Sequence, residues 1–498
     1  MVCTESEVNK VAGIGFHLQG LFEEKSLYSK VRAYGLAGLV AAGPWIIITL
    51  TMAIIQWMIY QFSAVSSEER ELFIFSVSYC FIFSQLLFST QQMTVTRYVS
   101  DLMYNNELSK VFPAFLGTTK VVTVLALGVW GIFFLVSPLS YLYKFVLLAL
   151  FLTINYMWIL LLFLSAAKHY KAIGWSFLTG GLCSVFLAIV VIGNNGIWLT
   201  GKYPVPLQLT ISIMIGMLVT VAGLMMVLLR TFPMWKSNGE FAYFTYYGRF
   251  PSLFWIGFLY TLGIWVCNWI IWFGEGSKVV AGSFIVHPIY DMAIFWSYLT
   301  ILPVMILFII SVETRFYKYY KTFFSYVNEG GTLNQIRRAK QKMNKVLFQE
   351  IQRLVRSQMV VTVIVVLNAG YLLSFLNVNE NVVQIFRLTA IGAFANGILL
   401  VMLLLLLYFE DRKGALYSAI IFFAINGGLT VSFLSFGYEG YGLSFSIGSL
   451  IGFVFAAVRL SIYLQRIDYH GFCGQGTQVN MSANRFQKLG EWLEHRQL

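Results

Sequence analysis

The chain has 498 residues, of which 58% are hydrophobic and only 11% are charged, and its mean hydropathy is +0.73. Water-soluble domains carry about 25% charged residues, so this composition excludes an ordinary soluble protein. The content of 9 prolines and 41 glycines among so many apolar residues also excludes a disordered or collagen-like chain. A membrane protein with many spans remains.

Long apolar runs follow one another along the whole chain. A transmembrane helix needs about 20 apolar residues, and these runs are continuous rather than alternating, which favours helices over a β-barrel. The predicted spans cover residues 35–62, 71–96, 112–137, 145–167, 172–193, 207–229, 252–273, 287–311, 359–376, 382–408, 415–436 and 443–464. The sequence therefore predicts an all-α polytopic membrane protein with about twelve transmembrane helices.

A weak internal duplication predicts two six-helix halves. Span one follows Tyr34 and is interrupted early by Gly43 and Pro44, while span seven follows an aromatic segment that ends in Pro251. Two such halves are the usual layout of secondary transporters. The predicted parts are a cytoplasmic or interfacial segment at 1–34, bundles at 35–229 and 230–464, and a cytoplasmic tail at 465–498.

The distribution of Lys and Arg predicts the orientation of these spans. Most of the 34 cations fall in the N-terminal tail, the even-numbered loops and the C-terminal tail. The odd-numbered loops carry only Arg70, Lys144, Lys202 and Lys278. By the positive-inside rule, both termini are predicted to be cytoplasmic. Topology and affinity for anionic lipids account for the net charge of +12, so nucleic acid is not an expected partner.

The longest predicted loop, residues 313–358, is strongly basic and is broken in two by Gly330 and Gly331. After the break, apolar residues recur at helical spacing among Lys and Arg, as in a helix that lies in the membrane interface. These residues are Ile336, Met343, Leu347, Ile351 and Leu354. Contact with membrane lipids and docking of a partner protein both fit this pattern.

Span two carries polar residues on one helical face. Unpaired polar side chains cost several kcal/mol in hydrocarbon, so such a face predicts either a wet cavity or hydrogen bonds between helices. The face consists of Gln85, Ser89, Gln92 and Thr96, and it leads to Arg97 and Asp101 at the cytoplasmic end. If the face lines a water-filled cavity, these residues are candidates for contact with substrate.

Further candidates lie in spans three and seven. Lys120 lies about 12 Å along the predicted third span, where it would either face a cavity or extend to the surface. Trp265, Trp269 and Trp272 share a face with Asn268 in span seven. Their rings could stack on sugars or belong to the aromatic belt at the membrane interface.

Three prolines and glycines are candidate hinges, and one carboxylate is a candidate for ion coupling. Gly43 and Pro44 in span one, and Pro303 in span eight, leave backbone carbonyls free and permit bending. Asp291 follows His287 at the outer end of span eight and could titrate during transport. Stabilisation of a carboxylate by the helix dipole is the alternative explanation.

No motif predicts an enzyme. The best phosphate-loop match, residues 196–203, has Tyr203 where Ser or Thr must hold magnesium. Neither HExxH nor GxSxG is found, and the five cysteines form no CxxC pair. We therefore expect no metal and no cofactor.

Several segments near the N-terminus resemble the PelG family of Pel exopolysaccharide transporters. They are Ala12-Gly-Ile-Gly-Phe-His-Leu18, Ser26-Leu27, Ala33-Tyr34, Ala42-Gly43-Pro44-Trp45 and Thr96-Arg97-Tyr98-Val99-Ser100-Asp101. The resemblance implies the MOP flippase superfamily, with two bundles that alternate access to a central cavity. It also implies export of Pel, a polymer rich in N-acetylgalactosamine and galactosamine, with a PelF-like glycosyltransferase and PelD-like and PelE-like membrane proteins as partners.

We therefore expect a transporter that carries a polysaccharide, or a lipid-linked sugar precursor, outward. The alternatives are a MATE-like drug or lipid exporter and a non-transporting membrane scaffold for a polysaccharide synthase. The sequence leaves the energy source and the oligomeric state open.

Overall fold

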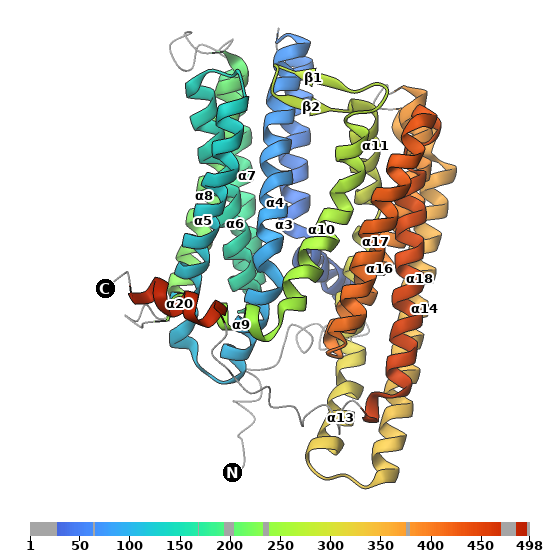
Figure 1. The fold of residues 1–498 in the computed structure, drawn as a ribbon. Coiled ribbons are helices and arrows are strands. Elements are labelled where there is room, and N and C mark those ends of the chain that lie inside the picture. The colour runs from blue at the N-terminus through green and yellow to red at the C-terminus, as the bar shows by residue number, and fades with distance from the viewer. Residues whose placement is uncertain are drawn as a thin grey trace. The chain divides into compact units, whose positions relative to one another are not determined.

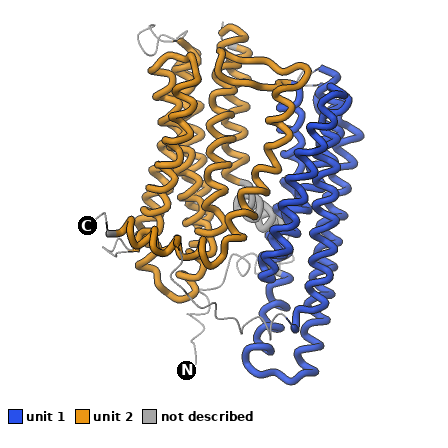
Figure 2. The backbone as a smooth tube through the Cα atoms, viewed as in Figure 1, with its two compact units in different colours: residues 1–42, 289–480 blue, residues 43–288, 481–498 orange. Residues whose placement is uncertain are grey.

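The computed structural model describes residues 27–62, 65–167, 169–193, 204–232, 239–374, 379–469 and 485–495. Nearly all of these residues are helical (Figure 1). The chain divides into two compact units, which are described separately (Figure 2). Unit 1 comprises Met1–Ala42 and Ile289–Asn480, and unit 2 comprises Gly43–Pro288 and Met481–Leu498. The predicted bundles at 35–229 and 230–464 have different bounds and stay a prediction.

Unit 2 contains most of the helices from the first half of the chain. Helix α3, Leu27–Phe62, reaches it across the boundary at Gly43. The other long helices are α4 (Ser67–Tyr104), α5 (Val111–Val136), α6 (Tyr141–Ala166), α7 (Tyr170–Gly193), α8 (Val205–Thr231) and α10 (Pro251–Ile271). The short elements are η1 (Leu108–Lys110), α9 (Phe244–Arg249), the strands β1 (Lys278–Val280) and β2 (Phe284–Val286), and the C-terminal α20 (Arg485–His495).

Unit 1 contains a broken span, a helical hairpin and three long helices. The broken span consists of α11 (Pro288–Leu299), α12 (Leu302–Ile310) and the π-helix η3 (Ser311–Phe316). The hairpin consists of α13 (Tyr317–Asn328) and α14 (Leu333–Leu367), and it is followed by the short α15 (Ala369–Ser374). The remaining elements are α16 (Glu380–Tyr408), α17 (Arg412–Phe433), η4 (Leu434–Glu439) and α18 (Leu443–Gln465).

Within the described residues, eleven helical segments are long and apolar enough to cross a membrane. They match the predicted spans except the ninth, 359–376. Its apolar residues are divided between the end of α14 and α15, because Asn368 ends α14 and its amide donates to the Ile364 carbonyl at 2.8 Å. Asn competes for backbone hydrogen bonds and so favours helix ends. The rest of α14 is too rich in Lys and Arg to count as apolar.

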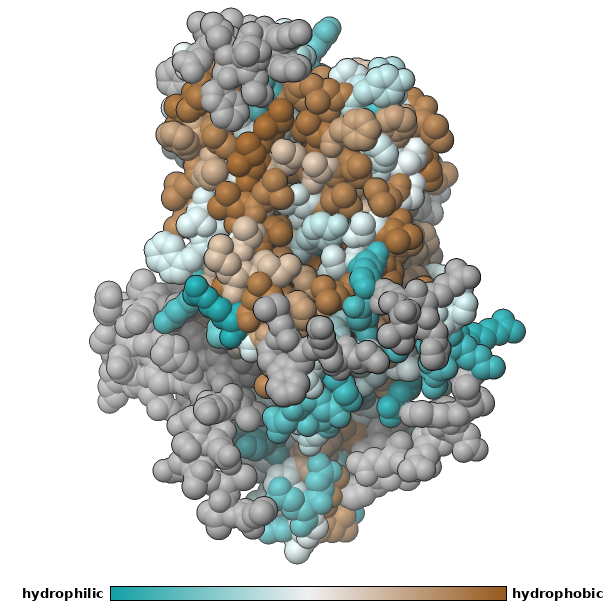
Figure 3. All heavy atoms as spheres, turned by 90° about the vertical axis from the view of Figure 1, so that its left-hand side faces the viewer, coloured by the Kyte–Doolittle hydropathy of each residue, from teal (hydrophilic) through white to brown (hydrophobic). Residues whose placement is uncertain are grey.

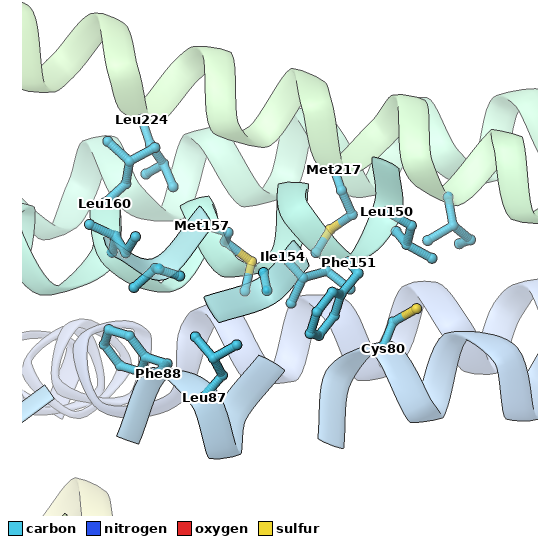
Figure 4. Close-up of a cluster of buried hydrophobic side chains, with 14 of the residues drawn as sticks. Cys80, Leu87, Phe88, Leu150, Phe151, Ile154, Met157, Leu160, Met217 and Leu224 are labelled. Carbon is cyan, nitrogen blue, oxygen red and sulfur yellow. The ribbon is translucent and has the colours of Figure 1, made fainter. Parts of the chain in front are cut away.

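The core of unit 2 lies where α6 packs against α4 and α8 (Figure 4). Ile154, Met157 and Leu160 of α6 are fully buried. They share one cluster with Leu87 of α4 and Leu224 of α8. Lipid is as apolar as these side chains, so close packing rather than exclusion of water holds such helices together.

Small residues bring α7 and α8 into close contact. A Cβ on Gly180 would lie 2.5 Å from the Gly216 carbonyl oxygen, and a Cβ on Gly216 would lie 2.5 Å from the Gly180 carbonyl oxygen. Ser184 and Thr220 complete the crossing, and their hydroxyls hydrogen-bond to carbonyls of their own helices. This is the small-residue packing that lets membrane helices approach each other.

A β-hairpin closes one end of unit 2. Strands β1 and β2 pair antiparallel, with Val279 opposite Ile285. They are joined by the three-residue loop 281–283, in which the Ser283 N–H donates to the Val280 carbonyl at 3.0 Å, and Ala281 and Gly282 have positive φ, 48° and 61°. Tyr79 of α4 donates a hydrogen bond to the Ile285 carbonyl, so the hairpin is fixed to the helix that carries the predicted polar face.

In unit 1, α16 packs against α18, α17, α14 and α12. The turn between α16 and α17 is held by Asp411, whose carboxylate accepts two hydrogen bonds from the Arg459 guanidinium of α18, at 2.6 and 3.0 Å. Asp411 also caps α17 through the Gly414 backbone N–H. An ion pair therefore accommodates Arg459 in the last predicted span.

The predicted basic segment 313–358 forms η3, α13 and most of α14. Ile336, Met343, Leu347 and Leu354 of α14 are buried within unit 1, and α13 packs along this helix. Their burial differs from the prediction of a helix whose apolar face contacts lipid. The physical reason is that α14 is one continuous helix from the hairpin into the ninth apolar run, so its apolar face follows the protein core.

We expect Gly180→Ala to destabilise unit 2 by about 1–3 kcal/mol, because the new methyl group overpacks the α7–α8 crossing. Gly128→Ala in α5 is the matched control, since nothing lies within 4 Å of its Cβ position. Ala favours helix over Gly by about 1 kcal/mol, so this control keeps or raises the unfolding temperature. Thermal unfolding in detergent measures both, and equal midpoints would contradict the packing argument.

Candidate functional site

The predicted polar face of α4 is divided between contacts and exposed positions. Gln85 accepts a hydrogen bond from the Trp265 indole of α10 at 3.1 Å. Ser89 is buried and donates to the Leu86 carbonyl of its own helix, whereas Gln92 and Thr96 are exposed. Gln85 thus fits the interpretation of hydrogen bonds between helices, Ser89 bonds within its own helix, and Gln92 stays a candidate for contact with substrate.

Aromatic stacking joins α4 to the C-terminal part of α10 and its cap residue Trp272. We call this contact the α4–α10 seam, formed by Tyr79, Phe83 and Gln85 of α4 with Trp265, Trp269 and Trp272 of α10. Trp269 stacks on Phe83 with centroids 6.0 Å apart, and Trp272 stacks on Tyr79 at 5.1 Å. The tryptophans predicted as sugar contacts are therefore held in place by α4.

Two polar groups of α10 lie inside unit 2. Asn268 is only 2% exposed and accepts a weak hydrogen bond from the Cys267 thiol at 3.6 Å. The Trp269 Nε1 atom is buried and has no hydrogen-bond partner among the described residues. Buried donors usually have partners, so this indole is a group that a ligand or water would stabilise.

Residues 239–250, which we call the elbow, connect to α10 and pack against the end of α4. The Tyr247 hydroxyl donates to Gln91 Oε1 at 2.6 Å, and both side chains are buried. Neither residue was among the predicted candidates. Gln91 precedes Gln92 in the chain but lies about a third of a turn away from the polar face of α4. Helical spacing alone could not show that an aromatic residue of a distant loop would contact it.

The elbow also completes a charged cluster at the end of α4. Arg97 and Asp101 form an ion pair at 3.3 Å, and the Tyr246 hydroxyl donates to Asp101 at 2.9 Å. The Arg97 guanidinium lies over the Phe250 ring, 5.8 Å from its centroid. Burial, followed by the hydrogen bond to Asp101, raises the pKa of Tyr246, so the phenol remains a donor at neutral pH. Two predicted site residues are therefore together in one half-exposed cluster.

Lys120 belongs to the same end of unit 2 but to a separate ion pair. Its ammonium donates to the Glu240 carboxylate of the elbow, and the Lys120 side chain is 47% exposed. Gly117, one turn earlier on α5, makes this approach possible, because a Cβ there would lie 2.0 Å from the Glu240 carbonyl oxygen. The structure therefore gives Lys120 a partner that the sequence interpretation lacked.

Of the hinge candidates, Gly43 and Pro44 lie within the continuous helix α3, whereas Pro303 lies at a break between two helices. The boundary between the two units falls at Gly43, next to Pro44, which lies inside α3. Pro303 lies in the first turn of α12, where span eight is broken into α11 and α12. The Thr300 carbonyl at this break accepts a hydrogen bond from the Gln358 amide of α14 at 2.6 Å. Pro303 thus agrees with irregular backbone, whereas bending at Gly43 and Pro44, and motion at all three residues, stay a prediction.

Asp291 is half-buried in the first turn of α11, where the helix dipole favours a carboxylate. His287 is fully buried and its Nε2 lies 2.7 Å from the Glu275 carbonyl oxygen. A role for Asp291 in ion coupling stays a prediction. The phosphate-loop match at 196–203 lies outside the described residues, and within them no group of three or more His, Cys, Asp or Glu side chains is arranged to hold a metal.

We expect Tyr247→Phe to cost about 1–3 kcal/mol of stability, because it leaves the buried Gln91 oxygen without its donor. Tyr246→Phe is the matched control, since Asp101 is partly exposed and water can replace the lost hydroxyl. Thermal unfolding in detergent would show a clearly larger loss for Tyr247→Phe. A larger loss for Tyr246→Phe would contradict the assigned difference in burial.

Comparison with solved structures shows the fold. The chain is similar to a MOP superfamily transporter from Pyrococcus furiosus, described as having a binding pocket of reverse polarity, with 13% identity and a TM-score of 0.58 over 87% of this chain and 96% of that chain. It is also similar to an outward-facing multidrug resistance MATE transporter, with 13% identity and a TM-score of 0.57 over 88% and 96%. An inward-facing MATE transporter gives 12% identity and a TM-score of 0.53 over 87% and 95%.

A comparison with curated proteins finds no match. The family model PelG, described as a putative exopolysaccharide exporter, matches residues 11–472. This range contains every long helix described above, so the resemblance of the N-terminal segments extends over nearly the whole chain. The chain therefore belongs to the PelG family, and its fold is that of the MOP superfamily of transporters.

Proposed function

We propose that this transporter exports an exopolysaccharide of the Pel type, rich in N-acetylgalactosamine and galactosamine, across the bacterial cytoplasmic membrane. The observation that carries the proposal is the match of residues 11–472 to the exopolysaccharide exporter family. The described side chains fit a sugar cargo. The α4–α10 seam offers aromatic rings and amides, and the cluster at Arg97 and Asp101 offers charged hydrogen-bonding groups.

Alternating access is the mechanism that we propose. Support comes from the division of the chain into two units at Gly43 and after Pro288, and from the break between α11 and α12 near Pro303. Bending at such positions requires carbonyls that can change partners, and proline provides them. Gly43, Pro44 and Pro303 are the proposed hinges, and Asp291 is the proposed coupling group.

The proposed cargo is a growing polysaccharide or a lipid-linked sugar. The proposed partners are a PelF-like glycosyltransferase and PelD-like and PelE-like membrane proteins. The α13–α14 hairpin supports such docking, because exposed cations follow the side of α14 opposite its buried face. They are Arg338, Lys342, Lys345, Arg353 and Arg356. With both termini cytoplasmic, this hairpin lies on the side where the polymer is made.

A second candidate function is export of drugs or lipids, which the likeness to multidrug MATE structures favours. Purified protein in vesicles would separate this function from both polysaccharide export and a scaffold role. A deletion strain that becomes drug-sensitive while it still secretes polysaccharide would favour the drug exporter. Absence of any transport, with an intact synthase complex, would favour the scaffold.

We expect Arg97→Ala and Lys120→Ala to abolish polysaccharide secretion while membrane insertion is unchanged, because each removes a cation from the proposed substrate route. Lys110→Ala is the matched control, since Lys110 also pairs with a glutamate but lies at the exposed turn before α5. Secreted polymer is measured in a complemented deletion strain, together with the amount of transporter in the membrane.

Glu240→Gln separates the two roles of Lys120. If Lys120 acts on substrate, this variant keeps the cation and secretes polymer, whereas a purely structural ion pair makes it as defective as Lys120→Ala. Normal secretion by the Arg97 and Lys120 variants would remove these residues from the proposed site.

A further inference from the structure

The C-terminal helix α20 lies beyond the residues that match the family model, and it is docked on the elbow of unit 2. Glu494 accepts a hydrogen bond from the Phe241 backbone N–H at 3.2 Å. A Cβ on Gly490 would lie 3.1 Å from the Phe241 carbonyl oxygen, so this glycine allows close approach. The Phe486 ring lies 6.1 Å from the Tyr247 ring.

Helical spacing gives α20 three different sides. The docked side carries Gly490 and Glu494, and the side with Gln487 and Glu491 is polar. A third side, about a third of a turn from the docked side and opposite the polar side, begins with Arg485 and is otherwise apolar. Its large residues are Phe486, Leu489 and Trp492, which are 44%, 44% and 48% exposed.

The position of α20 along unit 2 places it at the edge of the apolar surface. The elbow contacts α5 at Lys120, and Val124, one turn further along α5, is an apolar residue with 70% exposure. One turn corresponds to about 6 Å. In Figure 1, α20 runs across the end of the α5–α8 helices rather than parallel to them. In Figure 3, apolar side chains cover the upper part of the side that faces the viewer.

These observations favour lipid at the membrane interface as the surroundings of the apolar side. Interfacial helices lie at the membrane boundary with a polar side opposite an apolar side. Their Trp and Phe side chains enter the headgroup region. Helix α20 has this arrangement, with protein on its remaining side. Arg485 and Lys488 add positive charge on a helix that would meet anionic headgroups.

We propose that α20 lies in the membrane interface, with Leu489 and Trp492 inserted into the lipid leaflet and Phe486 at the border between the leaflet and the elbow, and that it anchors the elbow at that depth. The elbow carries Tyr246 and Glu240, so this contact reaches the ion pairs of Arg97 and Lys120. The proposal concerns a lipid contact of this chain and does not depend on which cargo is transported.

Spin labels on the full-length protein in nanodiscs of phosphatidylcholine and phosphatidylglycerol test the insertion. The native cysteines are replaced, and one cysteine is introduced as Leu489→Cys or, as matched control on the polar side, Glu491→Cys. We expect the ratio of accessibility to oxygen over a water-soluble nickel chelate to be several-fold higher at 489 than at 491. Equal ratios would mean that the apolar side faces water and would overturn the proposal.

Protection of the 489 label from both reagents would mean that protein covers it, either a second copy or another partner, and would also overturn the proposal. A second measurement uses Trp492 without cysteine changes. The fluorescence difference between the native protein and Trp492→Phe should be quenched by lipids brominated on their acyl chains. If the brominated lipids do not quench this fluorescence difference, insertion is contradicted. This measurement stays decisive even where a labelled variant fails to fold.

Discussion

A polar group that this chain places in the bilayer is costly unless it has a partner, and this constraint explains the contacts of the buried amides. Gln85 bonds to Trp265, Gln91 to Tyr247, and Gln358 to the Thr300 carbonyl. In water these amides would be satisfied by solvent, whereas in hydrocarbon each unsatisfied group costs several kcal/mol. The pairs therefore fix which helices are neighbours, a choice that nonspecific packing of Leu, Ile and Phe would leave open.

The elbow gathers several of these pairs at one end of unit 2. Its residues contact α4 through Tyr246 and Tyr247, and α5 through Glu240. The predicted site residues Arg97, Asp101 and Lys120 are thus held by a segment of twelve residues that precedes α10. A change in the position of this segment would therefore alter the contacts of all three residues together. The sequences of α4 and α5 alone do not reveal this connection.

The sequence predicted those features that depend on local composition. Apolar length located the spans, and Pro303 marked the break in span eight. The prediction of the ninth span was less accurate, because a single residue, Asn368, ends the helix within an apolar run. Pairs such as Lys120 with Glu240, or Asp411 with Arg459, join residues far apart in the chain, so no periodicity could reveal them. The hairpin of β1 and β2 lies between predicted spans seven and eight and was not predicted, because strands of three residues carry too short a pattern of alternation to recognise.

The hydrogen bond from the Gln358 amide to the Thr300 carbonyl has a consequence for movement within unit 1. Gln358 lies on α14, a single rod of 35 residues, or about 50 Å, that extends from the basic hairpin into the apolar part of unit 1. The rod is stiff along its axis because each turn is hydrogen-bonded to the next. Any axial displacement at the hairpin must therefore carry Gln358 with it, and either the Thr300 carbonyl follows or its hydrogen bond breaks.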